Sequence, residues 1–292
     1  MRVLSSSILI AFFYTSAAAV AQQSAPEVVV IRSGDATLHA HLWRPPGQGP
    51  FPAILINHGS GRTREELQRL GPYEQQSETL GPVFARHGYI CLFLFRRGVG
   101  HSTDQGENAI DAMNRVFAAR GQEARNATQL ELLEHRELDD ATAALAFLRA
   151  VPGVDSNRLA LVGHSFGGSL TILLAEREPA LRGAVIFSAA GYSWDKSPEL
   201  RSRLLAALSR IRAPVFFIHA ANDYSLNPGK VMDERLARLG KPHRLKIYPP
   251  IGRTPDDGHA FPLIGVKIWE SDVFKSLNDW MRNDADRKRV GR

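Results

Sequence analysis

The chain is poor in residues that could cross-link it. Cys91 is the only cysteine among 292 residues, so the chain forms no internal disulfide and no zinc site built from several cysteines. Cys91 lies in the apolar run YICLFLF, and we therefore expect a small core residue there.

The sequence also lacks a linker, an internal repeat and a strong excess of one charge. No Gly/Ser-rich or Pro-rich stretch divides it, which favours a single domain. The net charge of +6 comes from 36 basic and 30 acidic residues, and the basic ones are scattered except in the C-terminal DRKRVGR. A charge cluster at a chain end is usually solvated, so we predict no nucleic-acid partner.

One apolar stretch stands out near the N-terminus, ILIAFFYTSAAAVA, residues 8–21. It follows Arg2 and ends in Ala19-Val20-Ala21, which is typical of a secretory signal peptide with its cleavage site. The alternative is a retained anchor, but the stretch is shorter than the ~20 residues that a spanning helix needs. We expect cleavage after Ala21, an exported protein that is periplasmic or secreted, and no membrane span in residues 22–292.

Short apolar runs alternate with segments of helical periodicity in the rest of the chain. Residues 27–32 and 37–45 favour an antiparallel strand pair, and continuous apolar runs predict further strands at 51–59, 88–95, 158–165, 183–190, 213–221 and 243–250. Helices are expected at 74–88, 132–153, 169–178, 229–240 and 266–281. This alternation predicts an α/β fold with a mostly parallel sheet flanked by helices.

Two segments depart from this alternation. Residues 61–73 form a polar loop after the third predicted strand, and residues 103–131 form an insertion after the fourth. Within the insertion Ile110, Met113, Val116 and Phe117 share one helical face, which predicts a short amphipathic helix. Asn126 begins the sequon Asn-Ala-Thr, which matters only in a host that glycosylates exported proteins. Both segments are expected to border a pocket.

The segment RLALVGHSFGGSL, residues 158–170, runs from a predicted strand through a tight turn into a helix. That context is the one in which a G-x-S-x-G motif presents a nucleophilic serine, here Ser165, on a sharp turn. Side chains at Gly163 and Gly167 would collide with the neighbouring strand and helix. The alternative is a glycine-rich turn with an inert serine.

A serine hydroxyl is a weak nucleophile, so it needs a base and an acid that orients the base. In motifs of this kind the acid follows a later strand and the histidine comes later still. PVFFIHAANDYSLNP supplies Asp223, and PPIGRTPDDGHAFPL supplies His259. We therefore predict a triad of Ser165, Asp223 and His259.

Other acidic residues fit the acid position less well. Asp195 comes one strand earlier and lies further into a connecting segment. Asp256 and Asp257 are too close in sequence to His259 to approach its ring from behind, and we expect them to shape the loop.

Other histidines have simpler interpretations. His243 begins a strand and is expected to point outward, and His219 lies inside an apolar strand as a hydrogen-bonded core residue. His164 precedes the serine, so its side chain is expected to face away.

A tetrahedral intermediate also needs hydrogen-bond donors. LINHGSG, residues 55–61, follows the third predicted strand, where glycines let backbone amides approach a ligand. We predict that the amides of Ser60 and Phe166 form an oxyanion hole, with Gly59 as the alternative to Ser60. His58 is expected to support this loop.

These residues resemble the α/β-hydrolase superfamily over nearly the whole mature chain, through FPAILINHGSG, LFRRGVGHS, GHSFGG, HAAND and DGHAF. Within it the chain is most similar to dienelactone hydrolase-like proteins and the catalytic domains of prolyl oligopeptidase-like enzymes. The resemblance implies an eight-stranded, mostly parallel sheet with helices on both faces. It also implies acyl-enzyme hydrolysis by a Ser–His–Asp triad without metal or organic cofactor.

The chain departs from these relatives in three ways. True dienelactone hydrolases carry a cysteine nucleophile where this chain has Ser165, so dienelactone is not carried over as the substrate. The oligopeptidases carry an N-terminal propeller that is not recognisable here, so peptidase activity is not carried over either. The aspartate nucleophile of haloalkane dehalogenases is missing, which excludes that chemistry.

The sequence therefore predicts an exported serine hydrolase that acts on an ester or a similar small acyl substrate. An acyltransferase using the same triad and a non-catalytic binding protein on a hydrolase fold stay as alternatives. Tyr192 and Trp194 are candidates for lining the pocket. The motifs do not identify the substrate or the oligomeric state.

Overall fold

The computed structural model describes residues 25–61 and 70–282. Within this part the chain forms one sheet of eight strands in the order β1-β2-β4-β3-β5-β6-β7-β8. The strands are β1 (Glu27–Ser33), β2 (Ala36–Trp43), β3 (Phe51–Asn57), β4 (Ile90–Phe95), β5 (Val154–His164), β6 (Gly183–Phe187), β7 (Val215–Ala220) and β8 (His243–Tyr248). The pairs β1–β2 and β2–β4 are antiparallel, and the remaining pairs are parallel. This confirms the predicted α/β fold and each predicted strand.

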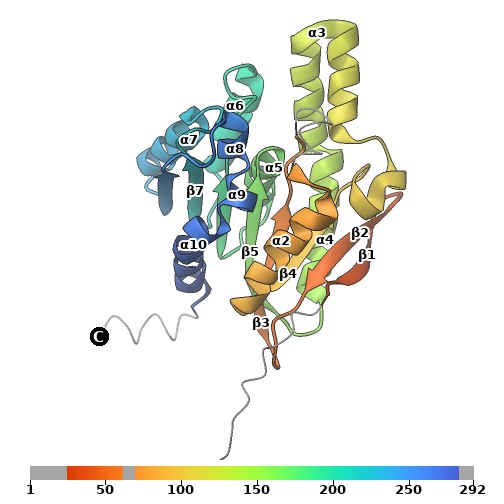
Figure 1. Cartoon of the computed structure of the whole chain (residues 1–292), viewed down its shortest axis with the longest axis vertical. Coiled ribbons are helices and arrows are strands. Elements are labelled where there is room, and N and C mark those ends of the chain that lie inside the picture. The colour runs from red at the N-terminus through yellow and green to blue at the C-terminus, as the bar shows by residue number, and fades with distance from the viewer. Residues whose placement is uncertain (1–24, 62–69, 283–292) are drawn as a thin grey trace, which may run out of the picture.

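Helices follow the strands along the chain (Figure 1). They are α2 (Tyr73–Arg86), the 3-10 helix η1 (Gly100–Gln105), α3 (Ala109–Glu134), α4 (Arg136–Ala150), α5 (Phe166–Arg177), α6 (Pro198–Leu208), α7 (Asn227–Arg238), α8 (Pro255–His259), α9 (Phe261–Ile264) and α10 (Val266–Met281).

The sheet divides the hydrophobic core into two layers. Alternate residues of each strand point to opposite faces. In β3, Leu55 packs in the layer formed with α4, α5, α6 and α7, whereas Ile54 and Ile56 pack in the layer formed with α2, α9 and α10. The predicted flanking of the sheet by helices on both faces is therefore correct, and Cys91 is fully buried in β4 as expected.

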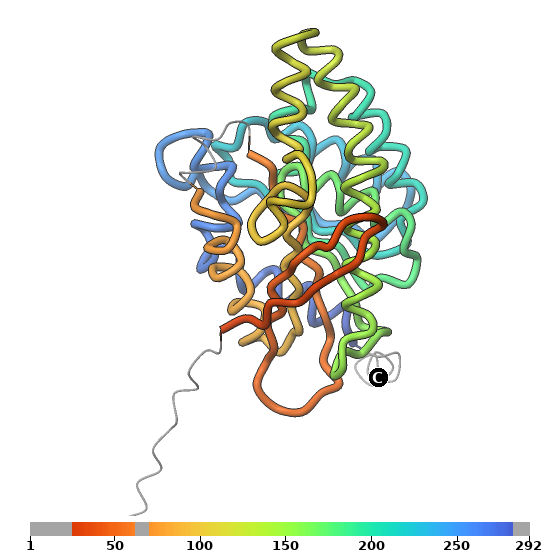
Figure 2. The backbone as a smooth tube through the Cα atoms, turned by 90° about the vertical axis from the view of Figure 1, so that its right-hand side faces the viewer, coloured from red at the N-terminus to blue at the C-terminus, as the bar shows by residue number. Residues whose placement is uncertain are grey.

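The insertion differs from its prediction. It is not a short helix: α3 extends over 26 residues and is interrupted at Gly121, whose φ of 78° and ψ of −169° fold the segment into two helical arms. The two arms stand side by side and project beyond the rest of the molecule in both views (Figures 1 and 2). Ile110 and Met113 are buried as expected, but Phe117 is 48% exposed.

Two other helices differ from the expectation. The predicted helix over 132–153 is divided at His135, whose φ of −121° and ψ of −100° separate α3 from α4. Helix α6 was not predicted. Its sequence signals are the N-cap Ser197, the proline in its first turn and buried leucines at positions 200, 204 and 208.

Several predictions fall outside the described residues. These are the signal peptide at 1–21, the C-terminal cluster at 286–292 and positions 62–69 of the polar loop. In the described part, no helix is both long enough and apolar enough to cross a membrane.

Candidate active site

Ser165 stands at the junction of β5 and α5 with φ 55° and ψ −116°. A non-glycine residue in this region stores about 1–3 kcal/mol of backbone strain, which surrounding contacts must overcome. The neighbouring glycines make the turn possible. A Cβ on Gly167 would lie 2.1 Å from the carbonyl oxygen of Asn57, and one on Gly163 would lie 2.2 Å from Oγ1 of Thr171. The predicted sharp turn is therefore present, and side chains at Gly163 and Gly167 would collide with their neighbours as expected.

The structure brings the three residues of the predicted triad together. Nε2 of His259 lies 2.8 Å from Oγ of Ser165, and Nδ1 of the same ring lies 2.7 Å from Oδ1 of Asp223. Both distances are within the range in which a histidine can accept a proton from one group while a carboxylate orients it. His259 and Asp223 are buried, so the hydrogen bond between them is shielded from water, whereas Ser165 is half-buried.

Asp223 accepts more hydrogen bonds than the triad alone requires. Nδ1 of His219 lies 2.8 Å from its Oδ2, and the amide of Tyr224 donates to Oδ1 at 2.7 Å. Burial by itself raises the pKa of Asp223, but the hydrogen bonds and the charges of His219 and His259 outweigh this, and the net pKa lies well below its ordinary value. Asp223 is therefore a carboxylate at neutral pH.

The loops that carry Asp223 and His259 are fastened to each other. The side-chain amide of Asn222 donates to the carbonyl oxygens of Ile251 and Thr254 at 2.8 and 2.7 Å. Thr254 and Asp257 form a capping box that begins α8, the short helix ending at His259. The position of the imidazole is thus set by backbone contacts on both sides.

The competing acids occupy other roles. Asp195, which is exposed, accepts a hydrogen bond from the hydroxyl of Ser225 at 3.4 Å. Asp256 accepts one from the hydroxyl of Tyr224 at 2.5 Å, and Asp257 caps α8. The expectation that Asp256 and Asp257 shape the loop is correct.

The structure confirms the expectations for His243 and His219 and contradicts the one for His164. His243 is exposed and contacts the carbonyl oxygen of Lys241, as expected. His219 is a hydrogen-bonded core residue, but its partner is Asp223, which was not foreseen. His164 does not face away from the site: its Nε2 lies 2.8 Å from the carbonyl oxygen of His259. Burial, and next the neighbouring His259, lower the pKa of His164 to about 3, so this ring is neutral and its Nε2–H donates.

The predicted oxyanion donors border the same pocket as Ser165. Ser60 follows β3, and Phe166 is the first residue of α5, where amides have no partner within the helix. The alternative, Gly59, is also close, because a Cβ on it would lie 3.3 Å from Cβ of Ser165. The hydroxyl of Tyr73 donates toward the carbonyl oxygens of Gly59 and Ser60 at 3.3 and 3.4 Å, which fixes the orientation of this loop.

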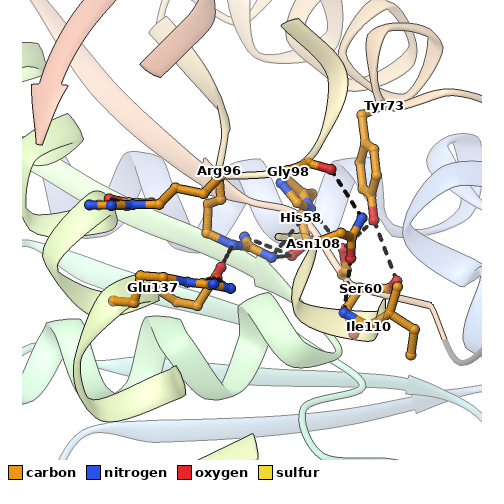
Figure 3. Close-up of polar contacts among 12 residues, drawn as sticks. His58, Ser60, Tyr73, Arg96, Gly98, Asn108, Ile110 and Glu137 are labelled. Carbon is orange, nitrogen blue, oxygen red and sulfur yellow. Dashed lines mark hydrogen bonds and ion pairs between the residues drawn. The ribbon is translucent and has the colours of Figure 1, made fainter. Parts of the chain in front are cut away.

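A buried ion pair supports the loop from behind (Figure 3). Nε of Arg96 lies 2.7 Å from Oε2 of Glu137, with side chains only 3% and 1% exposed. Both terminal nitrogens of Arg96 donate to the carbonyl oxygen of His58 at 3.0 Å, and its guanidinium lies 5.5 Å from the ring centroid of Phe166. Arg96 therefore touches both segments that carry the predicted donors. His58 supports the loop, as expected.

The two arms of α3 (Ala109–Glu134), called the hairpin from here on, begin beside this network. Asn108 accepts a hydrogen bond from the amide of Ile110 at 2.8 Å and donates to the carbonyl oxygen of Gly98 at 3.2 Å (Figure 3). The start of α3 is thus fixed to the segment after β4 that carries Arg96.

An open pocket is lined by both Ser165 and His259. The hairpin contributes Met113, Arg125 and Gln129 to its lining, and the segment after β6 contributes Tyr192 and Ser193. The expectation that the insertion borders the pocket is correct, as is the one for Tyr192. Trp194 is buried in the core instead.

Arg125 and Gln129 are pocket residues that sequence reasoning missed. Their spacing of four positions puts them on one helical face, but nothing in the sequence shows which way that face points. Arg125 is 7% exposed, and its guanidinium lies 6.0 Å from the ring centroid of Tyr192. Within the described residues it has no carboxylate partner, and Oε1 of Gln129 is buried without a hydrogen bond.

A family model described as "Dienelactone hydrolase family" matches residues 39–263. The chain belongs to the dienelactone hydrolase family. This family consists of hydrolytic enzymes, and the match spans every element that carries the site.

Individual relatives are distant. The chain is 27% identical over 161 residues to "Quorum-quenching protein AidA" of Acinetobacter baumannii, a match that covers 55% of this chain and 43% of that protein. It is 23% identical over 268 residues to "Putative carboxymethylenebutenolidase" of Methylorubrum extorquens, covering 87% of this chain and 79% of that protein.

Among solved structures, the acylaminoacyl peptidase of Pyrococcus horikoshii has a TM-score of 0.58 and 18% identity. That match covers 86% of this chain and 42% of the peptidase. The chain thus spans less than half the length of this peptidase and of AidA, and the likeness to the peptidase shows the shared α/β-hydrolase fold.

Across residues 25–61 and 70–282, no group of three or more His, Cys, Asp or Glu side chains is placed to hold a metal ion.

Proposed function

We propose that the protein is an exported serine hydrolase that cleaves a carboxylic ester, open-chain or lactone, through an acyl-enzyme on Ser165. The observation that carries the proposal is the continuous hydrogen-bond chain from Ser165 through His259 to Asp223, at 2.8 and 2.7 Å. Export is supported by the leader at residues 1–21 alone. N-terminal sequencing of the protein recovered from its host tests that part, with Gln22 as the expected first residue.

In the first half-reaction Oγ of Ser165 attacks the substrate carbonyl carbon while its proton passes to Nε2 of His259. The charge of Asp223 stabilises the resulting imidazolium. The carbonyl oxygen becomes an oxyanion that the amides of Phe166 and of Ser60 or Gly59 bind, and each such donor contributes about 3–4 kcal/mol of transition-state stabilisation. The imidazolium then protonates the leaving alcohol as the ester bond breaks.

In the second half-reaction a water molecule attacks the acyl-enzyme. His259 removes one proton from this water and returns it to Oγ of Ser165 as the acyl–oxygen bond breaks. The products are a carboxylic acid and the free enzyme. The open pocket above Ser165 gives water the access that this step needs.

The lining of the pocket supports a proposal about the charge of the substrate. A buried guanidinium without a carboxylate partner is costly to maintain, and among the described residues that line the pocket none has an acidic side chain to balance Arg125. A substrate carboxylate reaching Arg125 removes that imbalance through charge-assisted hydrogen bonds. The name of the Methylorubrum extorquens relative refers to a lactone that bears a carboxyl group. We therefore propose that the preferred ester or lactone carries a negative charge.

A fluorophosphonate probe tests the nucleophile. We expect it to label the wild-type protein, and we expect Ser165→Ala to abolish both labelling and the turnover of short aryl esters. Ser209→Ala, on an exposed position at the end of α6, is the matched control and should label like the wild type. Folded wild-type protein that resists the probe and turns over no ester contradicts the proposal.

A pair of aryl esters tests the charge preference, one with a free carboxylate on its acyl part and one with that carboxylate methylated. We expect Arg125→Met to lower kcat/KM for the charged ester about 10–100-fold and to leave the neutral ester nearly unchanged, because a hydrogen bond to a charged group contributes about 1.5–3 kcal/mol. Arg115→Met, in the exposed part of the same helix, is the control. An equal loss on both esters would mean that Arg125 serves only the fold.

A further inference from the structure

Two imidazoles, rather than one, hold the carboxylate of Asp223. Nδ1 of His259 approaches Oδ1 at 2.7 Å, and Nδ1 of His219 approaches Oδ2 at 2.8 Å. A carboxylate only accepts hydrogen bonds, so both Nδ1 atoms carry a proton. With the amide of Tyr224 also on Oδ1, both oxygens are fixed.

We propose that His219 is a positioning residue of the triad: its Nδ1–H holds Oδ2 of Asp223 so that Oδ1 stays directed at His259. The same hydrogen bond stabilises the negative charge of Asp223, which orients His259. This inference rests on the proposed function. It assigns to a strand residue outside the Ser–His–Asp motif a direct effect on the reaction.

His219 is well suited to this role because it cannot move freely. It lies in β7 opposite Ile247 of β8 and is 1% exposed. Its ring packs against α7, where a Cβ on Gly229 would lie 2.5 Å from Nε2 and 2.7 Å from Cδ2. Strand β7 thus supplies a rigid donor, His219, four residues before Asp223. The position of the Asp223 carboxylate would otherwise be set only by the turn that follows this strand.

Two further titratable side chains of the described residues lie near this pair, those of His164 and Asp256. His164 at the end of β5 interacts with both Asp223 and His259, and burial keeps its pKa low enough that it is neutral. The carboxylate of Asp256 in α8 accepts a hydrogen bond from the hydroxyl of Tyr224 at 2.5 Å. His219 is therefore the group whose direct contact with Oδ2 stabilises the negative charge of Asp223.

Two substitutions at position 219 separate positioning from packing. Asn places an amide nitrogen where Nδ1 lies and keeps a donor for Oδ2, whereas Leu fills the space without a donor. We expect His219→Leu to lower kcat about 10–100-fold with little change in KM, because it removes a hydrogen bond to a charged group. His219→Asn should stay within about threefold of the wild-type kcat.

The pH dependence of kcat/KM gives a readout that a packing role does not move. Without the donor from position 219 the negative charge of Asp223 is less stabilised. Asp223 then attracts the protonated form of His259 more strongly. The acid limb of the profile should therefore move to higher pH in His219→Leu and not in His219→Asn. His41→Leu and His41→Asn are matched controls, because His41 is a buried histidine of β2 that contacts Ser77 and His101. We expect the acid limb of the pH profile to be unchanged in both.

Gly229→Ala repeats the test without changing the histidine, because the added Cβ displaces its ring. We expect the same fall in kcat and the same movement of the acid limb, and this variant decides the question if His219→Leu does not fold. Wild-type kcat and an unmoved limb in Gly229→Ala or in folded His219→Leu overturn the proposal. Equal losses in the Leu and Asn variants also overturn it. A wild-type protein that does not react with fluorophosphonate or esters overturns the proposed function, and this proposal with it.

Discussion

Glu137→Gln is the substitution whose consequence follows most directly from the buried contacts. The carboxylate of Glu137 is 1% exposed and pairs with Arg96 at 2.7 Å, and Arg96 is itself 3% exposed. Arg136 adds a second contact at 2.8 Å from a more exposed position. The change to Gln preserves the volume of the side chain and removes its charge, which leaves the Arg96 guanidinium buried without an anion.

Removing one partner of a buried pair costs about 3–5 kcal/mol. The remaining hydrogen bonds from Arg96 to His58, and a neutral one to the new amide, favour the lower end, about 3 kcal/mol. For a domain of this size the melting temperature falls about 2–4 °C per kcal/mol, so we expect a decrease of about 6–12 °C. We also expect a lower kcat for ester turnover, because the loop that carries Ser60 loses its support.

Differential scanning calorimetry measures the first effect, and the same preparation with an aryl ester measures the second. Glu107→Gln breaks the exposed pair with Arg115 and is the matched control, with no measurable change in either quantity expected. A melting temperature of Glu137→Gln within about 2 °C of the wild type would refute the claim that Arg96 depends on this carboxylate.

Three further predictions concern the sharp turn at Ser165, stability in acid and the sequon at Asn126. Gly167→Ala should destabilise the protein by about 1–3 kcal/mol in urea titrations and reduce probe labelling, because its Cβ would lie 2.1 Å from the carbonyl oxygen of Asn57. His164 has a pKa of about 3 when folded against an ordinary value of 6.5, so the unfolded chain binds the extra proton and stability falls as the pH is lowered from 6.5 towards 3. His164→Gln should reduce that slope by at most about 1.4 kcal/mol per pH unit, measured by urea titrations at several pH values. Asn126 should carry no glycan when folded protein is treated with a glycosyltransferase, as checked by mass spectrometry, because its side-chain nitrogen is buried and donates to the carbonyl oxygen of Lys196.

The strands could be predicted from the sequence because their signal is local. A continuous apolar run such as residues 90–95 is needed wherever helices cover both faces of a sheet, and the structure buries all six of its residues. Helix α6 shows the limit of this reasoning. Its leucines at 200, 204 and 208 have helical spacing, but the arginines at 201 and 203 interrupt the apolar pattern by which the other helices were recognised.

The candidate triad was predictable for a different reason. A sharp turn between a parallel strand and a helix constrains which residues fit, so Gly163, Ser165 and Gly167 identify the turn without knowledge of the rest. The parallel sheet then brings the ends of β5 and β7 to one edge, and chain order suffices to nominate Asp223 and His259. The prediction for His164 was wrong because the loop that carries His259 passes directly over it, which chain order does not show.

The residues that the sequence did not reveal are those whose partners depend on the packing of separate elements. Arg125 lies in the second arm of the hairpin, 40 positions before Ser165, and it reaches the pocket only because Gly121 turns the chain back on itself. Read as one short amphipathic helix, residues 103–131 place no arginine near the nucleophile. The hairpin whose fold the sequence did not reveal thus brings a buried guanidinium, that of Arg125, to the described lining of the pocket, and the proposed preference for an anionic ester depends on this residue. The reaction can therefore be inferred from a local turn, whereas the choice of substrate depends on how an inserted segment folds over it.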